Sequence, residues 1–416
     1  MTALSSEQLL QFLLAIGLML FAGKLFGELF RKIKQAAVVG EIIAGILLGP
    51  TLFGVLSPET FDWIFPSSGP VSYSIDGLTT LSIIFLLLAV GLEVDLSVLI
   101  KFGRAAIKTT FLSMLIPFIL GFLGGYLLTP IFNLSGSNQL LFSLFLGMAF
   151  SISALPIIAR TLLDLGIFKS NLGMMIIASA MFNDLLGWIG FSILLSVAES
   201  QKAGPPLIIA IPLILLFSFL MIFVLRRIIS KAVFWIQNNF SWPGGILGFI
   251  ITFGLAGSII TEKLGVHSIL GAFIVGVAIG DSVHLEARTR EIIQQFITHI
   301  FAPLFFVNIG LHFNFIQSFD LMIVLIVVGL GFIGKIVGAG IGARWGGFSS
   351  AESLAAAFAL NSRGVLEIIL AIFALKLNLI NAEIFEAVIV LVVLSSIISG
   401  PAIKIILNKR THLKKN

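Results

Sequence analysis

Asp184 is the residue of this sequence whose type and position most directly suggest chemistry. It lies in the middle of an apolar run at residues 172–198. Because about 20 apolar residues cross a bilayer, its carboxyl group is predicted near the membrane midplane. A charged side chain at that depth costs about 3 kcal/mol on an isolated helix, and intramembrane acids typically mark paths for ions or protons. The alternative is a permanently protonated Asp184 that serves only helix packing.

The chemistry open to Asp184 follows from having one carboxylate in a tight, partly dry place. Ala180 lies one turn before it and Gly187 one turn after it, so small side chains leave room for a small ion. A proton and a monovalent cation would compete for the same carboxylate oxygens, which is sufficient for exchange. Asn183 does not titrate, but its amide oxygen can bind a cation and its NH2 group can hold a neighbouring side chain.

The composition places the helix that carries Asp184 in a membrane protein. The chain has 416 residues, of which 58% are hydrophobic and 11% charged, with a mean hydropathy of +1.13. A soluble globular protein has roughly a quarter of its residues charged. Cysteine is absent, which excludes disulfides and thiolate chemistry. The five histidines show no metal-ligand spacing. The net charge of +5 is assigned to loop asymmetry and not to nucleic-acid binding.

Apolar runs predict about 13 membrane spans. The run at 267–281 is short for a crossing, and the run at 244–262 is interrupted by glycines. With the N-terminus outside, most lysines and arginines fall in cytoplasmic loops, while residues 57–76 contain none. We therefore expect a multi-pass protein of the cell (inner) membrane with its C-terminus in the cytoplasm. No cleavable signal is evident at the start.

The sequence contains an internal repeat. The run from Phe85 to Leu92 resembles the run from Phe305 to Leu311, each ending in Gly-Leu, and 44–49 resembles 271–276. Both matches are seven spans apart. Because seven is odd, the halves must be inverted in the membrane, and inverted repeats are typical of secondary transporters with discontinuous helices at the binding site.

Two spans related by this repeat are predicted to be broken at membrane depth. The first contains Ser151, Ser153 and Pro156, and proline removes a backbone donor and disfavours helix at the residue before it. The second contains the polar insertion from Asn361 to Gly364. We predict non-helical segments that cross near Asp184 and offer oxygens to a cation, with Ser153 among the ion- or proton-binding residues. A simple kink is the alternative at Pro156.

Other charged residues lie within the predicted spans. Lys335 follows a glycine-rich helix face, and snorkelling to the interface is the alternative to a buried role. Arg363 and Glu367 have i, i+4 spacing and are expected to pair, in either a structural or a gating role. Glu41 and Asp95 are placed near the cytoplasmic ends of their spans, where they either shape a cation entry funnel or are simply solvated.

With these residues in view, the sequence resembles the monovalent cation:proton antiporter-2 family, which includes Kef-type and plant CHX-type exchangers. The resemblance covers nearly the whole chain. Its motifs are Val38-Val39-Gly40-Glu41-Ile42-Ile43-Ala44-Gly45 with Leu48-Gly49-Pro50, Gly91-Leu92-Glu93-Val94-Asp95, Asn183-Asp184, Leu270-Gly271-Ala272-Phe273, Pro303-Leu304-Phe305-Phe306, and Asn361-Ser362-Arg363-Gly364 with Glu367.

The resemblance implies an all-α sodium/proton antiporter fold of 13 transmembrane helices, with two discontinuous, crossing helices, and a homodimer in the lipid bilayer. It divides the chain into a scaffold, or dimer, domain at 1–104 and 201–319, a mobile ion-transport core at 105–200 and 320–406, and a short tail at 407–416. Kef-type members carry a long cytosolic nucleotide-binding tail, so here we expect no such regulatory domain.

The implied function is secondary antiport of Na+ or K+ against H+ by alternating access, with Asp184 as the shared site, Lys335 as the core-domain lysine, and no cofactor beyond the transported ions. Electrogenic relatives carry two consecutive acids. Asn183 stands at the first of these positions, which leaves Lys335 without its usual partner and favours electroneutral exchange. A Kef-like cation efflux channel is the alternative. An intramembrane aspartyl hydrolase needs two facing acids, and the only other deep acids of the sequence, Glu41 and Glu367, lack any hydrolase motif, so we expect no enzyme.

Overall fold

The computed structural model of the chain is all-helical in the residues that it describes, which are 4–33, 37–93, 96–132, 138–199, 212–213, 216–217, 219–264, 268–312 and 319–413. The chain forms two compact units, one of Met1–Asp95 with Pro205–Gln317 and one of Leu96–Gly204 with Ser318–Asn416. Each unit therefore combines one segment from each half of the sequence. The scaffold and core roles of the predicted segments stay a prediction.

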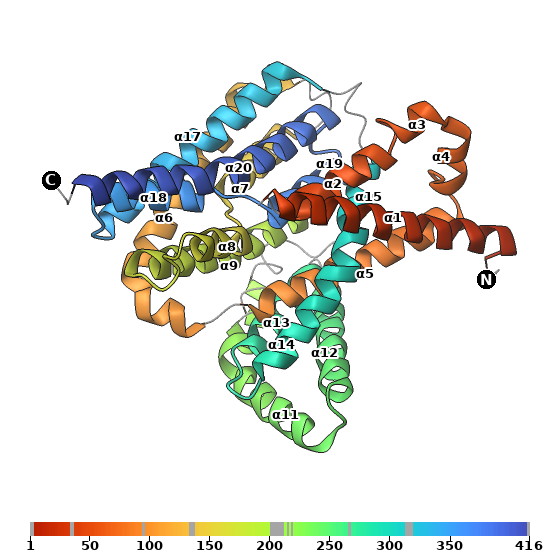
Figure 1. Cartoon of the computed structure of the whole chain (residues 1–416), viewed down its shortest axis with the longest axis horizontal. Helices are drawn as coiled ribbons and strands as arrows, with labels where there is room; N and C mark the ends of the chain where they lie inside the picture. The colour runs from red at the N-terminus through yellow and green to blue at the C-terminus, as the bar shows by residue number, and fades with distance from the viewer. Residues whose placement is uncertain are drawn as a thin grey trace. The chain divides into compact units, whose positions relative to one another are not determined.

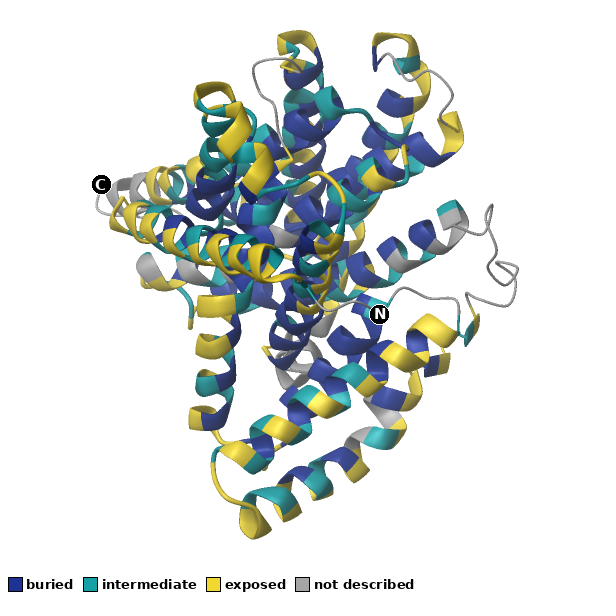
Figure 2. Cartoon of the chain, turned by 90° about the vertical axis from the view of Figure 1, so that its right-hand side faces the viewer, coloured by how far each residue is buried: buried dark blue, intermediate teal, exposed yellow. Residues whose placement is uncertain are grey.

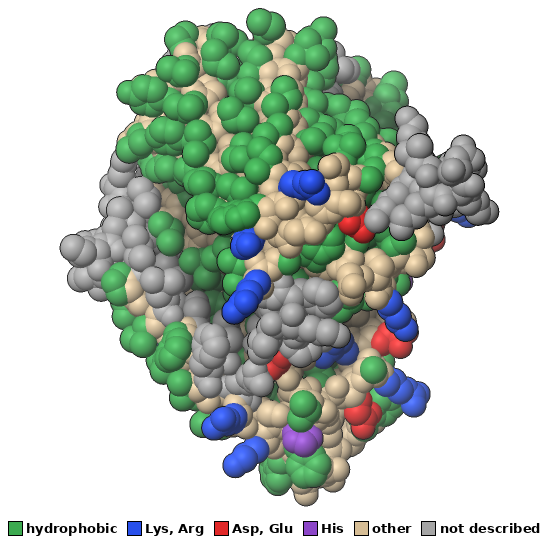
Figure 3. Space-filling model, turned by 90° about the vertical axis from the view of Figure 1, so that its left-hand side faces the viewer, with side chains coloured by type: hydrophobic (Ala, Val, Ile, Leu, Met, Phe, Trp, Pro, Cys, Tyr) green, Lys and Arg blue, Asp and Glu red, His purple; other side chains and the backbone are tan. Residues whose placement is uncertain are grey.

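In the described residues, nine helices are long and apolar enough to cross a membrane. The other predicted spans are the two interrupted ones, the short run at 267–281, and the run at 206–226, part of which lies outside the described residues. Exposed apolar residues agree with a lipid environment: Leu321, Leu325, Ile333 and Ile341 of one helix are each more than half exposed. Figure 2 shows exposed and buried residues alternating along many helices, and Figure 3 shows hydrophobic side chains over much of one face.

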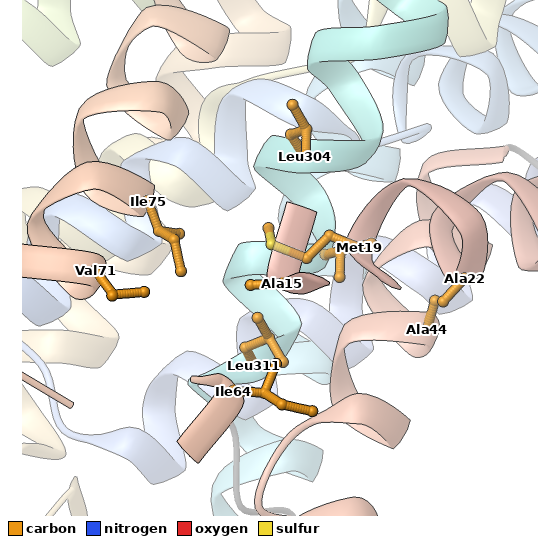
Figure 4. Packing of buried hydrophobic residues seen from close by; sticks show 10 residues of the cluster. Ala15, Met19, Ala22, Ala44, Ile64, Val71, Ile75, Leu304 and Leu311 are labelled. Carbon is orange, nitrogen blue, oxygen red and sulfur yellow. The ribbon is translucent and has the colours of Figure 1, made fainter. Parts of the chain in front are cut away.

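The first unit is built from short and long helices (Figure 1). Its elements are α1 (Ser6–Lys32), α2 (Ala37–Leu48), α3 (Phe53–Leu56), α4 (Pro58–Ile64), α5 (Pro70–Leu92), the π-helix η2 (Leu220–Leu225), α11 (Arg226–Asn239), α12 (Gly244–Lys263), α13 (Ser268–Gly280), α14 (Ala287–Phe296), the π-helix η3 (Ile297–Phe301) and α15 (Ala302–Leu311). Ala15 and Met19 of α1 pack with Ile75 of α5 and with Leu304 and Leu311 of α15 (Figure 4).

Two glycine crossings in this unit reproduce the internal repeat. Helix α2 packs on α15, and α13 packs on α5. A Cβ atom on Gly45 would overlap the carbonyl oxygen of Val307, and a Cβ atom on Gly276 would overlap that of Leu88. Glycine is required at both places because the backbones approach so closely. Each crossing thus joins a span from one half of the sequence to a span from the other.

The register of one repeat match differs from the sequence alignment. Leu88 and Val307 occupy equivalent places, as the match of Gly91-Leu92 with Gly310-Leu311 predicts. Gly276, however, is equivalent to Gly45 and not to Gly49, so the alignment of 44–49 with 271–276 is wrong by about one helical turn. A G-x-x-x-G spacing occurs in both helices, and sequence similarity alone cannot tell its two glycines apart.

The second unit contains Asp184, Lys335 and the two predicted breaks, and Figure 1 labels its helices. Its elements are α6 (Leu96–Leu127), the 3-10 helix η1 (Thr129–Phe132), α7 (Gln139–Ser151), α8 (Leu155–Asp164), α9 (Asn171–Glu199), α17 (Leu321–Trp345), α18 (Ser350–Leu360), α19 (Val365–Lys376) and α20 (Ala382–Leu413). Side chains cap several starts: Asn138 accepts from α7, Asp320 accepts from α17, and Ser349 and Glu352 form a capping box on α18.

Helix α17 lies against α6 along its glycine face, as the sequence suggests. A Cβ atom on Gly334 would lie 2.9 Å from the Cα atom of Pro117, and one on Gly342 would lie 2.8 Å from the Cα atom of Thr109. Larger side chains would push the two helices apart. This close packing places Lys335 beside α6, within reach of the carbonyl of Ser113.

Candidate functional site

Two interrupted helices meet in the second unit, which confirms the fold prediction of discontinuous, crossing helices. Helix α7 stops before α8, and α18 stops before α19. The backbone N–H of Ala154 donates to the carbonyl of Ser362 at 2.9 Å. The hydroxyl of Ser153 donates to the carbonyl of Leu360 at 2.7 Å. Backbone groups that a continuous helix would satisfy internally are therefore satisfied across the two breaks.

The local sequence explains both breaks. Pro156 lies in the first turn of α8, where its missing N–H is tolerated, and it prevents α7 from continuing. At the second break, a Cβ atom on Gly364 would lie 2.7 Å from the Cβ atom of Ala154. Glycine at position 364 thus allows the two breaks to cross closely.

Asp184 and Asn183 lie next to this crossing, on α9. Asp184 is 4% exposed and Asn183 is fully buried. The Nδ2 group of Asn183 donates to the hydroxyls of Ser113 and Ser153, each at 3.3 Å. Those hydroxyls donate in turn to the carbonyls of Thr110 and Leu360. Because the hydroxyl hydrogens are committed to carbonyls, the hydroxyls can only accept from Asn183, which fixes the orientation of its amide.

This orientation leaves an acceptor available at the site. In the part of the chain that the structure describes, the buried Oδ1 atom of Asn183 has no hydrogen-bond partner. The same holds for both amide atoms of Asn361 and for the hydroxyl of Ser362, in the second break. Buried polar atoms are normally satisfied, so each of these is a place for a ligand or water.

The space beside Asp184 differs from the expectation at one position. A Cβ atom on Gly187 would lie 3.2 Å from the side chains of Ile152 and Leu366. Gly187 therefore lets α9 pack against the first break and the start of α19, and it does not provide open room for an ion. Ala180 is fully buried in the same helix.

Lys335 has a position that the sequence did not reveal. Its buried Nζ atom donates to the carbonyl of Ser113 at 3.0 Å and to the carbonyl of Ser151. The first carbonyl lost its helical donor because Pro117 has no N–H, and the second belongs to the last residue of α7. The snorkelling alternative is wrong, since the ammonium group is bound inside the unit. Lys335 also needs no acid at position 183 to hold it in place.

Arg363 satisfies the neighbouring carbonyls at the end of α7. It donates to Ala149 at 2.9 Å, to Phe150 at 3.1 Å and to Gly331 at 2.9 Å, and it forms the expected ion pair with Glu367. Both charged side chains are fully buried. The last turn of α7 thus faces two cationic groups, which complement the negative end of a helix dipole.

The remaining predicted residues lie apart from this arrangement. Glu41 belongs to the first unit and is 4% exposed, so the reading of a simply solvated carboxylate is wrong. Asp95 lies outside the described residues. Ser113 is the site residue that the sequence analysis missed. Its signal was available, because Pro117 four residues later frees the carbonyl of Ser113.

Comparison with known proteins identifies the family. The family model described as "Sodium/hydrogen exchanger, transmembrane" matches residues 16–409. The chain belongs to this family. It is therefore a multi-pass membrane protein of an exchanger family. Its fold resembles that of the sodium proton antiporter MjNhaP1 from Methanocaldococcus jannaschii, with a TM-score of 0.67 and 16% identity, covering 96% of this chain and 98% of that one.

Curated relatives extend over nearly all of this chain. The Na(+)/H(+) antiporter NhaS4 of Synechocystis sp. is 29% identical over 96% of this chain and 98% of its own length. The K(+)/H(+) antiporter 1 of Saccharomyces cerevisiae is 28% identical over 97% of this chain, and cation/H(+) antiporter 17 of Arabidopsis thaliana is 29% identical over 94%. The chain spans about half the length of the yeast and plant proteins, at 47% and 48%.

Proposed function

We propose that this chain exchanges a monovalent cation, Na+ or K+, for H+ across a membrane by alternating access, with Asp184 as the site that both ions share. The observation that carries the proposal is the buried pair Asn183-Asp184 on α9, next to two crossing helix breaks. Membership of an exchanger family and the antiporter names of its relatives support it.

Asp184 would bind either ion through the same oxygens. A proton neutralises the carboxylate directly, whereas a monovalent cation needs several oxygen atoms to replace its hydration shell. Asn183 Oδ1 and the second-break atoms Asn361 Oδ1 and Ser362 Oγ are acceptors without hydrogen-bond partners in the described part of the chain. These atoms are the proposed additional ligands, and the hydroxyls of Ser113 and Ser153 hold the amide of Asn183 in position.

The proposed cycle moves no net charge. A single acid that carries either H+ or one monovalent cation has the same charge in both loaded states. Asn183 supplies no second proton. Lys335 keeps its proton throughout in this mechanism, and its bonds to two backbone carbonyls give it a positioning role that does not require proton transfer.

Further parts of the proposal concern assembly and membrane placement. We propose a homodimer formed by the scaffold segments, in the cell (inner) membrane, with the N-terminus outside. The transported ions are the proposed ligands, with no other cofactor.

The test is transport in proteoliposomes that contain a pH-sensitive dye. Pulses of Na+ or K+ are expected to drive proton movement in the opposite direction, and Asp184→Asn is expected to abolish it while the protein still inserts and folds. Asp62→Asn, at an exposed acid of α4, is the matched control. Normal proton-coupled transport by Asp184→Asn would refute the site, and steady cation currents that ignore the proton gradient would favour a channel.

A further inference from the structure

Helix α20 contains a buried acid that the proposed exchange does not use. Glu386 is 1% exposed, and residues 384–389 around it are all buried. Neither carboxyl oxygen of Glu386 has a hydrogen-bond partner among the described residues. Glu367 differs, because one of its oxygens accepts from Arg363. Glu386 is therefore a buried carboxyl group that lacks the compensation that Arg363 gives to Glu367.

An unpaired carboxylate in such a place is strongly unfavourable. Removing a carboxylate from water without a compensating partner costs several kcal/mol or more, and such a group usually takes up a proton instead. Glu383, one turn earlier on the same helix, adds a second acid to this region, and like charges at this spacing repel. The neutral acid is the form of Glu386 that this environment accommodates.

Among the described residues, no basic side chain of the neighbouring helices hydrogen-bonds to Glu386. Helices α17, α18 and α19 pack against α20. Their charged residues are Lys335, Arg344, Glu352, Glu367 and Lys376. None of these side chains hydrogen-bonds to Glu386 in the described structure, because both of its oxygens are without partners. The proton is the one ligand of Glu386 that its surroundings favour.

Helix α20 also supports the second break. The hydroxyl of Ser396 donates to the carbonyl of Arg363 at 2.9 Å. The side chain of Leu391 packs on Gly331, whose carbonyl accepts from Arg363. Ser396 lies about 15 Å along the helix from Glu386. A change in how the start of α20 packs would therefore act on a helix that contacts the break.

We propose that Glu386 is a proton-binding site of its own, separate from Asp184 and occupied at neutral pH, and that loss of its proton loosens the start of α20 from the helices around it. A charged Glu386 would draw in water, which requires α20 to move away from its neighbours. The Glu386 proton would thus favour the packing that holds the second break in place.

Carbodiimide labelling tests the site. Dicyclohexylcarbodiimide reacts with protonated carboxyl groups in apolar surroundings, and peptide mass spectrometry locates the adduct. The full chain is labelled in proteoliposomes at pH 6–7. We expect Glu386 to be labelled far more than Glu286, which is an exposed acid of the same protein. Above the midpoint, labelling should fall about tenfold per pH unit. Asp184→Asn and saturating Na+ or K+ should leave it unchanged.

Two results of this labelling would overturn the proposal. Labelling of Glu386 at the level of Glu286 at pH 6 would mean that Glu386 is ionised. Protection by Na+ or K+ would mean that Glu386 belongs to the cation site. Neither measurement requires transport, so failure here is distinguishable from failure of the proposed exchange.

Hydrogen exchange of residues 384–392 tests the link to α20. At the same alkaline pH, the backbone amide hydrogens of residues 384–392 should exchange at least about tenfold faster in the wild type than in Glu386→Gln, which mimics the neutral acid. Asp62→Asn, at an exposed acid of α4, is the control and should behave like the wild type. Equal protection of the wild type and Glu386→Gln at every pH would overturn the proposed coupling.

Discussion

Arg363→Met is expected to destabilise the second unit far more than Glu367→Gln does. The guanidinium of Arg363 donates to the carbonyls of Ala149, Phe150 and Gly331 as well as to Glu367. Each buried carbonyl left without a donor costs about 1–3 kcal/mol. A stranded buried carboxylate adds about 3–5 kcal/mol. The total exceeds about 5 kcal/mol, which is comparable with the whole stability of a typical domain.

Glu367→Gln leaves the three carbonyl bonds of Arg363 intact and retains an acceptor for the fourth, so we expect a loss of about 1–3 kcal/mol. The double variant Arg363→Met/Glu367→Leu removes the stranded charge. It should recover about 3–5 kcal/mol of the loss caused by Arg363→Met alone, although the carbonyls of Ala149 and Phe150 stay without donors.

The assay is thermal unfolding of the detergent-solubilised full chain, together with the yield of folded protein from membranes. Arg31→Met is the control, because Arg31 pairs with Glu28 on an exposed helix face. Exposed pairs contribute about 0–1 kcal/mol, so this variant should melt like the wild type. Equal losses for Arg363→Met and Glu367→Gln would show that the ion pair, and not the bonding of the α7 carbonyls, holds this region together.

Three further predictions follow from the site and the repeat. The endpoint of exchange should not shift with an imposed membrane potential at fixed ion gradients; one extra charge per cycle would move it by about 2.3 kcal/mol per 100 mV and would mean that Lys335 or another group titrates. Asn183→Asp adds a second acid and should introduce voltage dependence in the same assay, and an unchanged endpoint would contradict the charge count. Gly45→Ala and Gly276→Ala should each lower the unfolding free energy by about 1–3 kcal/mol. Gly248→Ala is the control, because the space around Gly248 is open, and it should leave the unfolding free energy unchanged or raise it by up to about 1 kcal/mol. Wild-type melting of both Gly45→Ala and Gly276→Ala would refute the close approach of the helices.

Local sequence features predicted much of the architecture. Proline at position 156 and the polar insertion from Asn361 to Gly364 act on their own backbone within one turn of helix, so the breaks could be placed without a structure. The composition and the length of the apolar runs predicted a helical membrane protein, because each helix in lipid must satisfy its own backbone. The Arg363–Glu367 pair followed from i, i+4 spacing.

The sequence by itself thus determined that the chain lies in a membrane, where two of its helices break, and where Asp184 lies along its span. Only the tertiary structure decided that Lys335 bonds to carbonyls of Ser113 and Ser151, that Asn183 presents Oδ1 without a partner, and that Glu386 is buried without compensation. These features depend on contacts between residues far apart in the chain. The physical reason is that a backbone carbonyl freed in one helix carries no mark in the sequence of the helix that supplies its donor, so the pairing exists only once the helices pack.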